Sequence, residues 1–137
     1  MRVILKYHFR RCQCLTFLVT LLGVRGAVAQ DNSTPEVITK AFYSWYIRID
    51  SQGKFPLLDD RIFLYVEKKT INALRGDYRR GTLPGDGDYF TKVQDYDEKD
   101  WENSMAVHPA IMLEGVAVVP ITFGSNEKVS VLVFLRK

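Results

Sequence analysis

Carboxylates are concentrated in one stretch of the chain, from Asp86 to Glu102. The stretch holds seven acidic residues against two lysines, a local charge of −5, and the acidic residues are Asp86, Asp88, Asp95, Asp97, Glu98, Asp100 and Glu102. Carboxylates this close in sequence can bind a hard cation, act as general acid and base, or attract a basic protein partner. These three kinds of chemistry define the first hypotheses about function.

The spacing of the carboxylates does not fit the EF-hand template for calcium. Counting from Asp86, Phe90 stands where the third oxygen ligand belongs, Thr91 stands where glycine belongs, and Asp97 replaces the closing glutamate. We therefore expect a solvated acidic loop, with no metal ion and no cofactor.

Catalysis would have to rest on Asp95 or His108. Asp95 is the carboxylate best suited to acid–base work, but its neighbours do not place it in a cavity. The alternative is that Gln94 and Asp95 bond backbone groups where the loop enters a sheet. His108 is the sole histidine after residue 29, too few for a histidine zinc site and weak support for a Ser/His/Asp arrangement. We therefore predict that the protein is not an enzyme.

The first 29 residues have the composition of a secretory signal peptide. Arg2, Lys6, Arg10 and Arg11 precede the apolar run Leu15–Val24, and Ala27-Val28-Ala29 offers a small-residue cleavage site. The run is shorter than the roughly 18 apolar residues that a membrane span requires. We expect residues 1–29 to be removed, contact with the membrane to be transient, and residues 30–137 to form a single domain in the periplasm or outside the cell.

Removal of the signal peptide would reverse the sign of the net charge. The whole chain carries 19 basic and 16 acidic residues, and five of the basic residues lie before residue 30, which leaves a net charge of −2. A mildly acidic chain has no basic stripe for nucleic acid, so we expect no nucleic-acid partner. Both cysteines, Cys12 and Cys14, also lie in the signal peptide. Residues 30–137 therefore cannot form a disulfide or a thiolate metal site.

The longest amphipathic pattern lies in Pro35–Ile49. Apolar residues recur at steps of three and four, which predicts a helix wide enough to cover a sheet; they are Val37, Ile38, Ala41, Phe42, Trp45, Tyr46 and Ile49. Thr34 before Pro35 is typical of a helix N-cap. Tyr46 lies near the edge of the apolar stripe, so its hydroxyl is expected to reach the mouth of whatever the helix covers.

A second helical region is predicted over Arg61–Leu74, as one helix or as two short helices with a kink. Asp59 or Asp60 can cap it, and the expected buried residues are Leu58, Ile62, Tyr65, Val66, Ile71 and Leu74. Gly76 is expected to end this region, which explains the R-G-D tripeptide around it without an adhesion receptor. The glycine-rich segment Arg79–Gly87 that follows is typical of a loop.

From Met105 onward the pattern changes to β-structure. Runs rich in β-branched residues predict strands at Met105–Val107, Ile111–Phe123 and Lys128–Leu135. Gly124–Glu127 has the length of a hairpin loop, and Pro120 lacks an amide donor, which predicts a bulge or an edge there. Helices followed by an antiparallel sheet give an α+β fold in which the first helix covers the sheet.

Three features together resemble a family of small exported bacterial proteins of unknown function. They are F-Y-S-W-Y at Phe42–Tyr46, D-Y-F-T-K-V-Q-D at Asp88–Asp95, and the closing hydrophobic hairpin. The resemblance implies N-terminal helices packed on a curved antiparallel sheet, a cone of the cystatin-like or nuclear transport factor-like kind, with no established catalytic residues. It also implies one further strand beyond the last one here. The C-terminal edge strand would then be open to strand exchange, a homodimer or a partner's strand.

These observations favour an exported, non-enzymatic protein-binding domain, such as an inhibitor or an immunity-type partner of another periplasmic protein. The candidate contact residues are Tyr46, Asp88, Tyr89, Asp95, Asp97 and Trp101. This hypothesis predicts Tyr89, Asp95 and Trp101 on one exposed face. The alternative is a small-ligand binder or weak enzyme with Tyr46, Asp95 and His108 as its polar groups. It predicts Tyr46 and Asp95 converging in an enclosed cavity.

Overall fold

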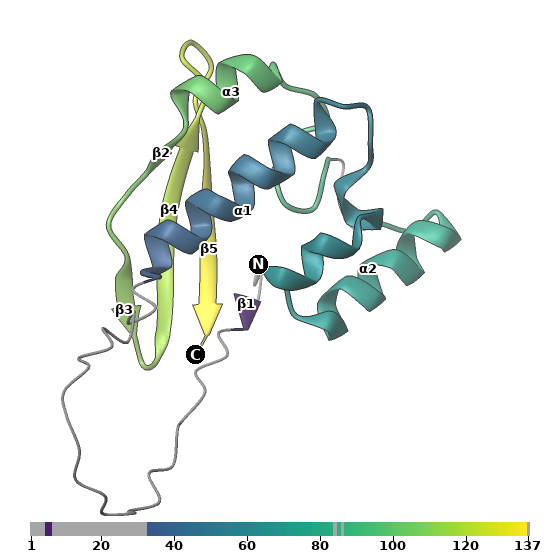
Figure 1. The fold of residues 1–137 in the computed structure, drawn as a ribbon, viewed down its shortest axis with the longest axis horizontal. Helices are drawn as coiled ribbons and strands as arrows, with labels where there is room; N and C mark the ends of the chain where they lie inside the picture. Colours follow the sequence, from purple (N-terminus) through teal and green to yellow (C-terminus); the bar gives the residue numbers. More distant parts are fainter. Residues whose placement is uncertain (1–4, 7–32, 84, 86, 137) are drawn as a thin grey trace, which may run out of the picture.

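The computed structural model describes residues 5–6, 33–83, 85 and 87–136 (Figure 1). Its helices are α1 (Pro35–Asp50), α2 (Lys68–Arg80) and α3 (Glu98–Ser104), with two short 3₁₀ segments, η1 (Pro56–Leu58) and η2 (Asp60–Leu64). Its strands are β1 (Leu5–Lys6), β2 (Ala106–Val107), β3 (Ile111–Leu113), β4 (Val116–Phe123) and β5 (Val129–Arg136). In Figure 1, α1 lies across one face of β4 and β5. This arrangement confirms the predicted α+β fold.

Helix α1 begins where the sequence predicts it. The Thr34 hydroxyl accepts a hydrogen bond from the Val37 amide at 3.4 Å, and Pro35 occupies the first turn. Four of the predicted stripe residues are buried, namely Phe42, Trp45, Tyr46 and Ile49. Val37 and Ala41 are exposed, so their expected burial was wrong.

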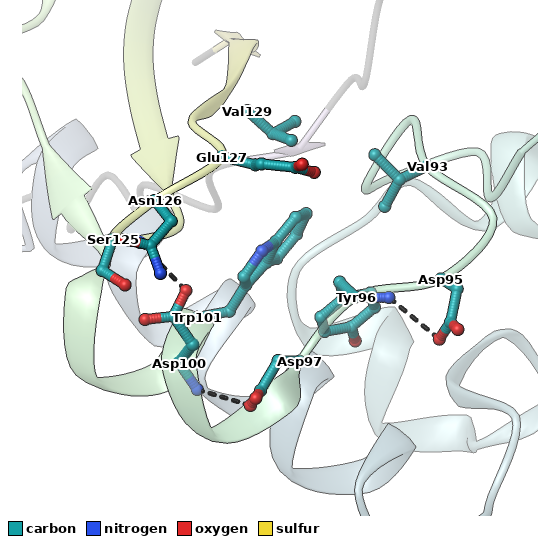
Figure 2. A pocket seen from close by; sticks show the side chains of 10 residues that line it. All are labelled: Val93, Asp95, Tyr96, Asp97, Asp100, Trp101, Ser125, Asn126, Glu127 and Val129. Atoms are coloured by element: carbon teal, nitrogen blue, oxygen red, sulfur yellow. Dashed lines mark hydrogen bonds between the residues drawn. The ribbon is translucent and has the colours of Figure 1, made fainter.

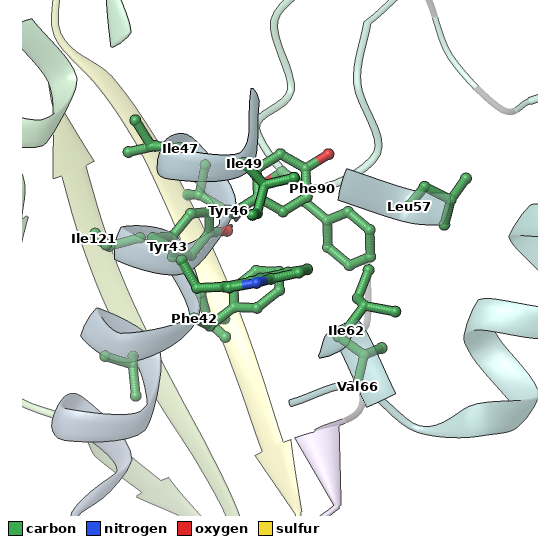
Figure 3. Packing of buried hydrophobic residues seen from close by; sticks show 14 of the residues in the cluster. Phe42, Tyr43, Tyr46, Ile47, Ile49, Leu57, Ile62, Val66, Phe90 and Ile121 are labelled. Carbon is green, nitrogen blue, oxygen red and sulfur yellow. Dashed lines mark hydrogen bonds between the residues drawn. The ribbon is translucent and has the colours of Figure 1, made fainter. Parts of the chain in front are cut away.

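The reason is that α1 is covered from two sides, not by the sheet alone. On one side the Tyr43 ring lies 5.0 Å from the Phe123 ring of β4. On the other side the Phe42 ring lies 5.4 Å from Phe90 and 5.7 Å from Tyr65. Figure 3 shows Phe42, Tyr43 and Phe90 within this packing. The buried face is therefore wider than the predicted stripe, and Val37 and Ala41 lie on the narrow side that remains in solvent.

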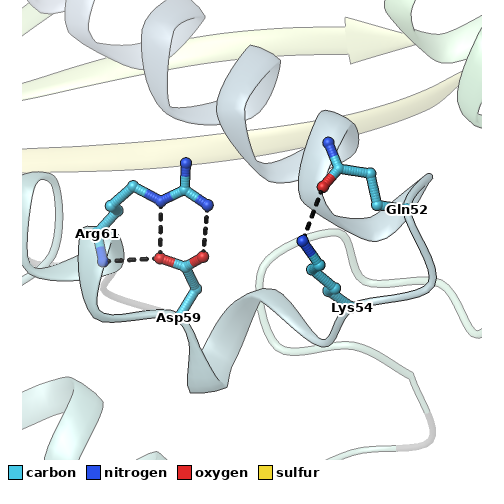
Figure 4. Close-up of polar contacts among 4 residues, drawn as sticks. All are labelled: Gln52, Lys54, Asp59 and Arg61. Atoms are coloured by element: carbon cyan, nitrogen blue, oxygen red, sulfur yellow. Dashed lines mark hydrogen bonds and ion pairs between the residues drawn. The ribbon is translucent and has the colours of Figure 1, made fainter.

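The second helical region is divided, as one of the two predicted alternatives had it. Asp59 caps η2 by accepting a hydrogen bond from the Arg61 amide at 2.9 Å, and the Arg61 guanidinium closes a bidentate pair with the same carboxylate (Figure 4). The hydrogen bonds from Arg61 lower the pKa of Asp59 to about 2. Leu58 is half exposed, so its expected burial was wrong, because η1 turns Leu57 inward instead.

Helix α2 runs past the glycine that was predicted to end it. Gly76 is buried inside the helix, and the left-handed residue that ends α2 is Gly81, with φ +67°. The Thr82 amide donates to the Asp77 carbonyl at 2.9 Å across this end. The prediction failed because Gly81, and not Gly76, adopts the left-handed conformation that ends the helix; Arg80 pairs with Asp77 at 2.6 Å in the last turn.

The long strand predicted over Ile111–Phe123 is in fact a hairpin. Glu114 and Gly115 both have positive φ, 44° and 81°, and they form a tight turn between β3 and β4. Pro120 lies within β4 opposite Leu132 of β5. The Pro120 carbonyl accepts from the His108 amide at 2.9 Å on the other side of the strand, between β2 and β3. The missing amide therefore falls in the gap between two short strands, where a proline is tolerated.

The N-terminal segment enters the described structure only at β1. Leu5 and Lys6 pair in parallel with Leu135 and Arg136 at the end of β5. The predicted apolar run and cleavage site lie outside the described residues, as does Asp86 of the acidic stretch. No helix within the described part of the chain has the length and apolar character needed to cross a bilayer.

Candidate functional site

Asp88 organises the loop that leads to the acidic stretch. One of its carboxylate oxygens accepts hydrogen bonds from the Phe90 and Thr91 amides at 2.8 and 2.9 Å, and from the Thr91 hydroxyl at 3.2 Å. Its other oxygen accepts from the Tyr46 hydroxyl at 2.8 Å. Asp88 is therefore engaged by its own loop and by α1, and its carboxylate is not presented to a partner.

Three tyrosine hydroxyls fix this loop to α1. Besides the Tyr46 bond, Tyr43 donates to the Phe90 carbonyl at 2.9 Å, and Tyr96 donates to the Asp50 carboxylate at 2.6 Å. Burial, more than any neighbouring charge, raises the pKa of all three hydroxyls far above the ordinary value. They remain protonated donors at any physiological pH, which gives them a structural role.

An open pocket of about 500 Å³ lies where the acidic stretch meets the β4–β5 loop (Figure 2). Its walls come from the segment before α3, from α3 itself and from the residues that lead into β5. The lining residues are Val93, Asp95, Tyr96, Asp97, Asp100, Trp101, Ser125, Asn126, Glu127 and Val129. Four of them are acidic and none is basic, so the pocket favours a cationic group.

The four carboxylates of this acidic pocket differ in how far the fold already uses them. Asp97 caps α3 by accepting from the Asp100 amide at 2.8 Å. Asp100 accepts from the Ser125 amide at 2.9 Å, and that bond lowers the pKa of its carboxyl. Asp95 and Glu127 are exposed, and Asp95 accepts only a local bond from the Tyr96 amide. Asp95 and Glu127 are therefore the carboxylates best placed to contact a partner.

The floor of the acidic pocket is aromatic. The Trp101 ring is stacked between Tyr96 at 4.2 Å and Phe123 at 4.4 Å. Only 4% of Trp101 is exposed, because its ring continues the hydrophobic core under the pocket. Both faces of the Trp101 ring are therefore covered, and the ring gives the pocket a rigid apolar floor beside the carboxylates, not a free face for a cation.

The structure brings together some of the predicted site residues and separates others. Asp95, Asp97 and Trp101 share the acidic pocket, whereas Tyr46 and Asp88 are bonded to each other at the α1–loop junction. Tyr89 is half-buried, packs on Phe90 at 5.1 Å and lies under the Lys92 ammonium. The expected exposed face of Tyr89, Asp95 and Trp101 is thus replaced by a pocket that holds two of the three.

The groups required by the ligand-binding alternative do not converge. Tyr46 does not line the acidic pocket with Asp95. His108 lies on the sheet, with its Nε2 atom 3.0 Å from the Thr122 hydroxyl oxygen. Within the described residues, no group of three side chains is arranged to hold a metal ion.

Several lining residues were missed at the sequence level. Asp100 could have been found, because Asp97 and Asp100 form a capping pattern at the start of a short helix. Glu127, Ser125 and Asn126 gave no such signal. They are ordinary hairpin-loop residues that reach the pocket only through the pairing of β4 with β5.

Comparison with known proteins gives one clear result. No family model matches the chain, and no curated protein does. Among solved structures, the chain matches the native and the selenomethionine crystal structures of the type VI effector–immunity complex Tae3–Tai3 from Ralstonia pickettii. Both matches show 46% identity over 76% of this chain. They cover 85% and 87% of the matched chains, with TM-scores of 0.73 and 0.72.

A match of this identity and coverage reaches beyond a shared fold. The matched structures are not described as cystatin-like or nuclear transport factor-like, so that description of the fold stays a prediction from the sequence. The chain belongs to the same family as the matched component of the Tae3–Tai3 effector–immunity complex.

Proposed function

We propose that this protein is the immunity-type partner of a type VI effector and that it binds the effector through the acidic pocket. The observation that carries the proposal is the 46% identity to a chain crystallised in an effector–immunity complex, over 85% of that chain. A protein of this family is thereby expected to act by binding another protein. The acidic pocket is the concave, charged surface that suits such a contact.

The immunity role suits this chain better than the effector role. Its buried polar groups have structural roles, since the tyrosine hydroxyls donate hydrogen bonds to Asp88, Asp50 and a backbone carbonyl. The described residues between 33 and 136 hold one histidine and no cysteine. A protein that inhibits by occupying a surface requires no catalytic group, so we assign a non-enzymatic role.

The pocket chemistry indicates which part of the effector is bound. The exposed carboxylates of Asp95 and Glu127 lie at the rim of the pocket, and Trp101 and Tyr96 form its aromatic floor. A lysine or arginine on the effector would pair with the carboxylates at the rim of the pocket. Complementary charge of this kind also accelerates the encounter between the two proteins.

The predicted signal peptide gives the compartment in which the two proteins meet. Export would place residues 30–137 in the periplasm or outside the cell, and the two proteins would meet there. A chain without cysteine after residue 29 folds there without a disulfide.

The test is capture of the partner by the tagged full chain from periplasmic extract of a bacterium that encodes it. We expect a type VI effector to be retained by the unaltered protein. The double variant Asp95→Asn, Glu127→Gln should fail to retain the effector. The control double variant Glu98→Gln, Glu102→Gln should still retain it. The control removes the same charge from α3 outside the pocket. Capture of no effector by the unaltered protein would contradict the proposed function.

A further inference from the structure

The β3–β4 hairpin carries a second surface, independent of the acidic pocket. All three residues of β3 are more than half exposed: Ile111 by 55%, Met112 by 58% and Leu113 by 57%. A strand on a packed sheet ordinarily buries every second side chain. Here both faces of the strand are in solvent, because the hairpin extends past the end of α1 (Figure 1). We call Ile111–Glu114 the apolar finger.

The apolar finger is held at a fixed angle. The Glu36 carboxylate of α1 accepts a hydrogen bond from the Ala110 amide, immediately before β3, at 2.7 Å. At the tip, Glu114 and Gly115 close the tight turn and leave the Glu114 side chain exposed. The finger is therefore already ordered, so that binding through its three apolar side chains and one negative charge would lose little conformational entropy.

The segment Phe63–Lys69, from the end of η2 to the first turn of α2, lines a cavity of about 560 Å³. Its apolar wall includes Leu64, whose side chain is 75% exposed, and the Tyr65 ring, which is stacked on Trp45 at 5.6 Å. Lys68 and Lys69 stand at one side of the cavity and are exposed. This cavity is within the size range of about 300–1,000 Å³ typical of binding pockets. Unlike the acidic pocket, it combines apolar surface with two lysines and one glutamate, Glu67, so its lining has a net positive charge.

We infer that the apolar finger of one molecule inserts into the Phe63–Lys69 cavity of a second copy. Ile111, Met112 and Leu113 would bury their apolar surface against Leu64 and its neighbours. Glu114 at the tip would meet Lys68 and Lys69. Insertion of each finger into the other molecule's cavity, related by a two-fold axis, closes a dimer.

Other occupants of the two surfaces match less well. Two fingers packed tip to tip would bring the two Glu114 carboxylates together. A finger in the acidic pocket would place Glu114 beside Asp95 and Glu127. Like charges in a contact are strongly unfavourable, so both arrangements are disfavoured. In the Phe63–Lys69 cavity, by contrast, Glu114 would meet lysines.

Disulfide trapping tests the contact directly in the full chain with Cys12→Ser and Cys14→Ser. Protein carrying Met112→Cys is mixed with protein carrying Leu64→Cys under mild oxidation. We expect mixed disulfide dimers to form about tenfold or more faster than with Leu132→Cys in place of Leu64→Cys, because a bound pair raises the effective concentration of the thiols. Leu132 is equally apolar and 54% exposed. Equal rates would overturn the inference.

A charge exchange tests the same contact in solution, by sedimentation from micromolar to millimolar concentration. The unaltered chain should dimerise, and Glu114→Lys should shift the dimer constant at least about tenfold toward monomer. A chain that carries Lys68→Glu and Lys69→Glu together with Glu114→Lys should dimerise as the unaltered chain does. A monomer at every concentration, or a dimer indifferent to Glu114→Lys, would show that the finger does not bind this cavity.

Discussion

At the scale of single residues, tyrosine–carboxylate pairs explain why the acidic stretch has a defined shape. Tyr46 and Tyr96 each donate to a carboxylate at the α1–loop junction, to Asp88 at 2.8 Å and to Asp50 at 2.6 Å. A hydrogen bond from a buried hydroxyl to a charged oxygen contributes more than one between neutral groups. The loop that leads to the acidic pocket is therefore fixed from below.

Tyr96→Phe tests one of these pairs. We expect it to lower the free energy of unfolding by about 1.5 kcal/mol, because the ring still packs on Trp101 while the Asp50 carboxylate loses its donor. Urea unfolding followed by tryptophan fluorescence measures the change. Tyr78→Phe is the matched control, since Tyr78 is exposed on α2. A change for Tyr96→Phe no larger than for the control would refute a structural role for the hydroxyl.

The Glu36–Ala110 bond predicts a pH dependence of stability. The backbone hydrogen bond from Ala110 lowers the pKa of Glu36 below its ordinary 4.5 in the folded protein. A lowered folded-state pKa stabilises the fold above the unfolded-state pKa, and this contribution disappears as the pH falls through the folded-state value.

Glu36→Gln keeps an oxygen acceptor but removes the titration. The unaltered protein should exceed Glu36→Gln in stability by about 0.5 kcal/mol at pH 7, a small difference because water screens this partly exposed carboxylate, and the difference should vanish below the folded-state pKa of Glu36. Urea unfolding at a series of pH values measures it. A difference that stays constant with pH would exclude the titration of Glu36 as its cause.

Residue patterns in the sequence reveal caps and cores better than they reveal tertiary partners. Thr34, Asp59 and the aromatic anchors of α1 were predictable, because each follows from neighbours within four positions. The engagement of Asp88 by Tyr46 was not. It joins residues 42 positions apart, and no local rule gives such a distance in space.

At the scale of elements, the structure differs from the sequence-based prediction at two short segments. Helix α3 has seven residues and was not predicted, because its charged sequence has little amphipathic pattern besides Trp101. The β3–β4 turn at Glu114-Gly115 was hidden inside a continuous apolar run that matched one long strand. Burial of Trp101 holds α3 in place, whereas the β3–β4 turn depends on the pairing of β3 with β4 and on the positive φ of Glu114 and Gly115.

The end of α2 gives an element-scale prediction with two opposite signs. Gly81→Ala should destabilise the protein by about 1 kcal/mol, because φ there is +67°. Gly76→Ala should be neutral or stabilising by up to about 0.5 kcal/mol, since a β-carbon there meets only the flexible end of Arg80 at 3.3 Å. Thermal unfolding of both variants checks the pair. The reverse order of stability would mean that the helix ends at Gly76.

At the scale of the whole molecule, the acidic pocket exists only in the folded chain. Its walls come from residues 93–101 and 125–129, which α3 and the β4–β5 hairpin bring together through the bond from the Ser125 amide to Asp100. The sequence predicted half of this wall from its charge. The other half depends on the register of β4 with β5, which places Glu127 opposite the acidic stretch.

The most direct test of this account is the affinity of the full chain for its captured effector, measured by calorimetry at low and high salt. We predict that Asp95→Asn, Glu127→Gln weakens binding at least about tenfold and flattens the salt dependence, as removal of paired interfacial charges does. Glu98→Gln, Glu102→Gln, with the same change in net charge, should bind like the unaltered protein. Equal affinities for the two variants would contradict the assignment of the acidic pocket as the effector-binding site.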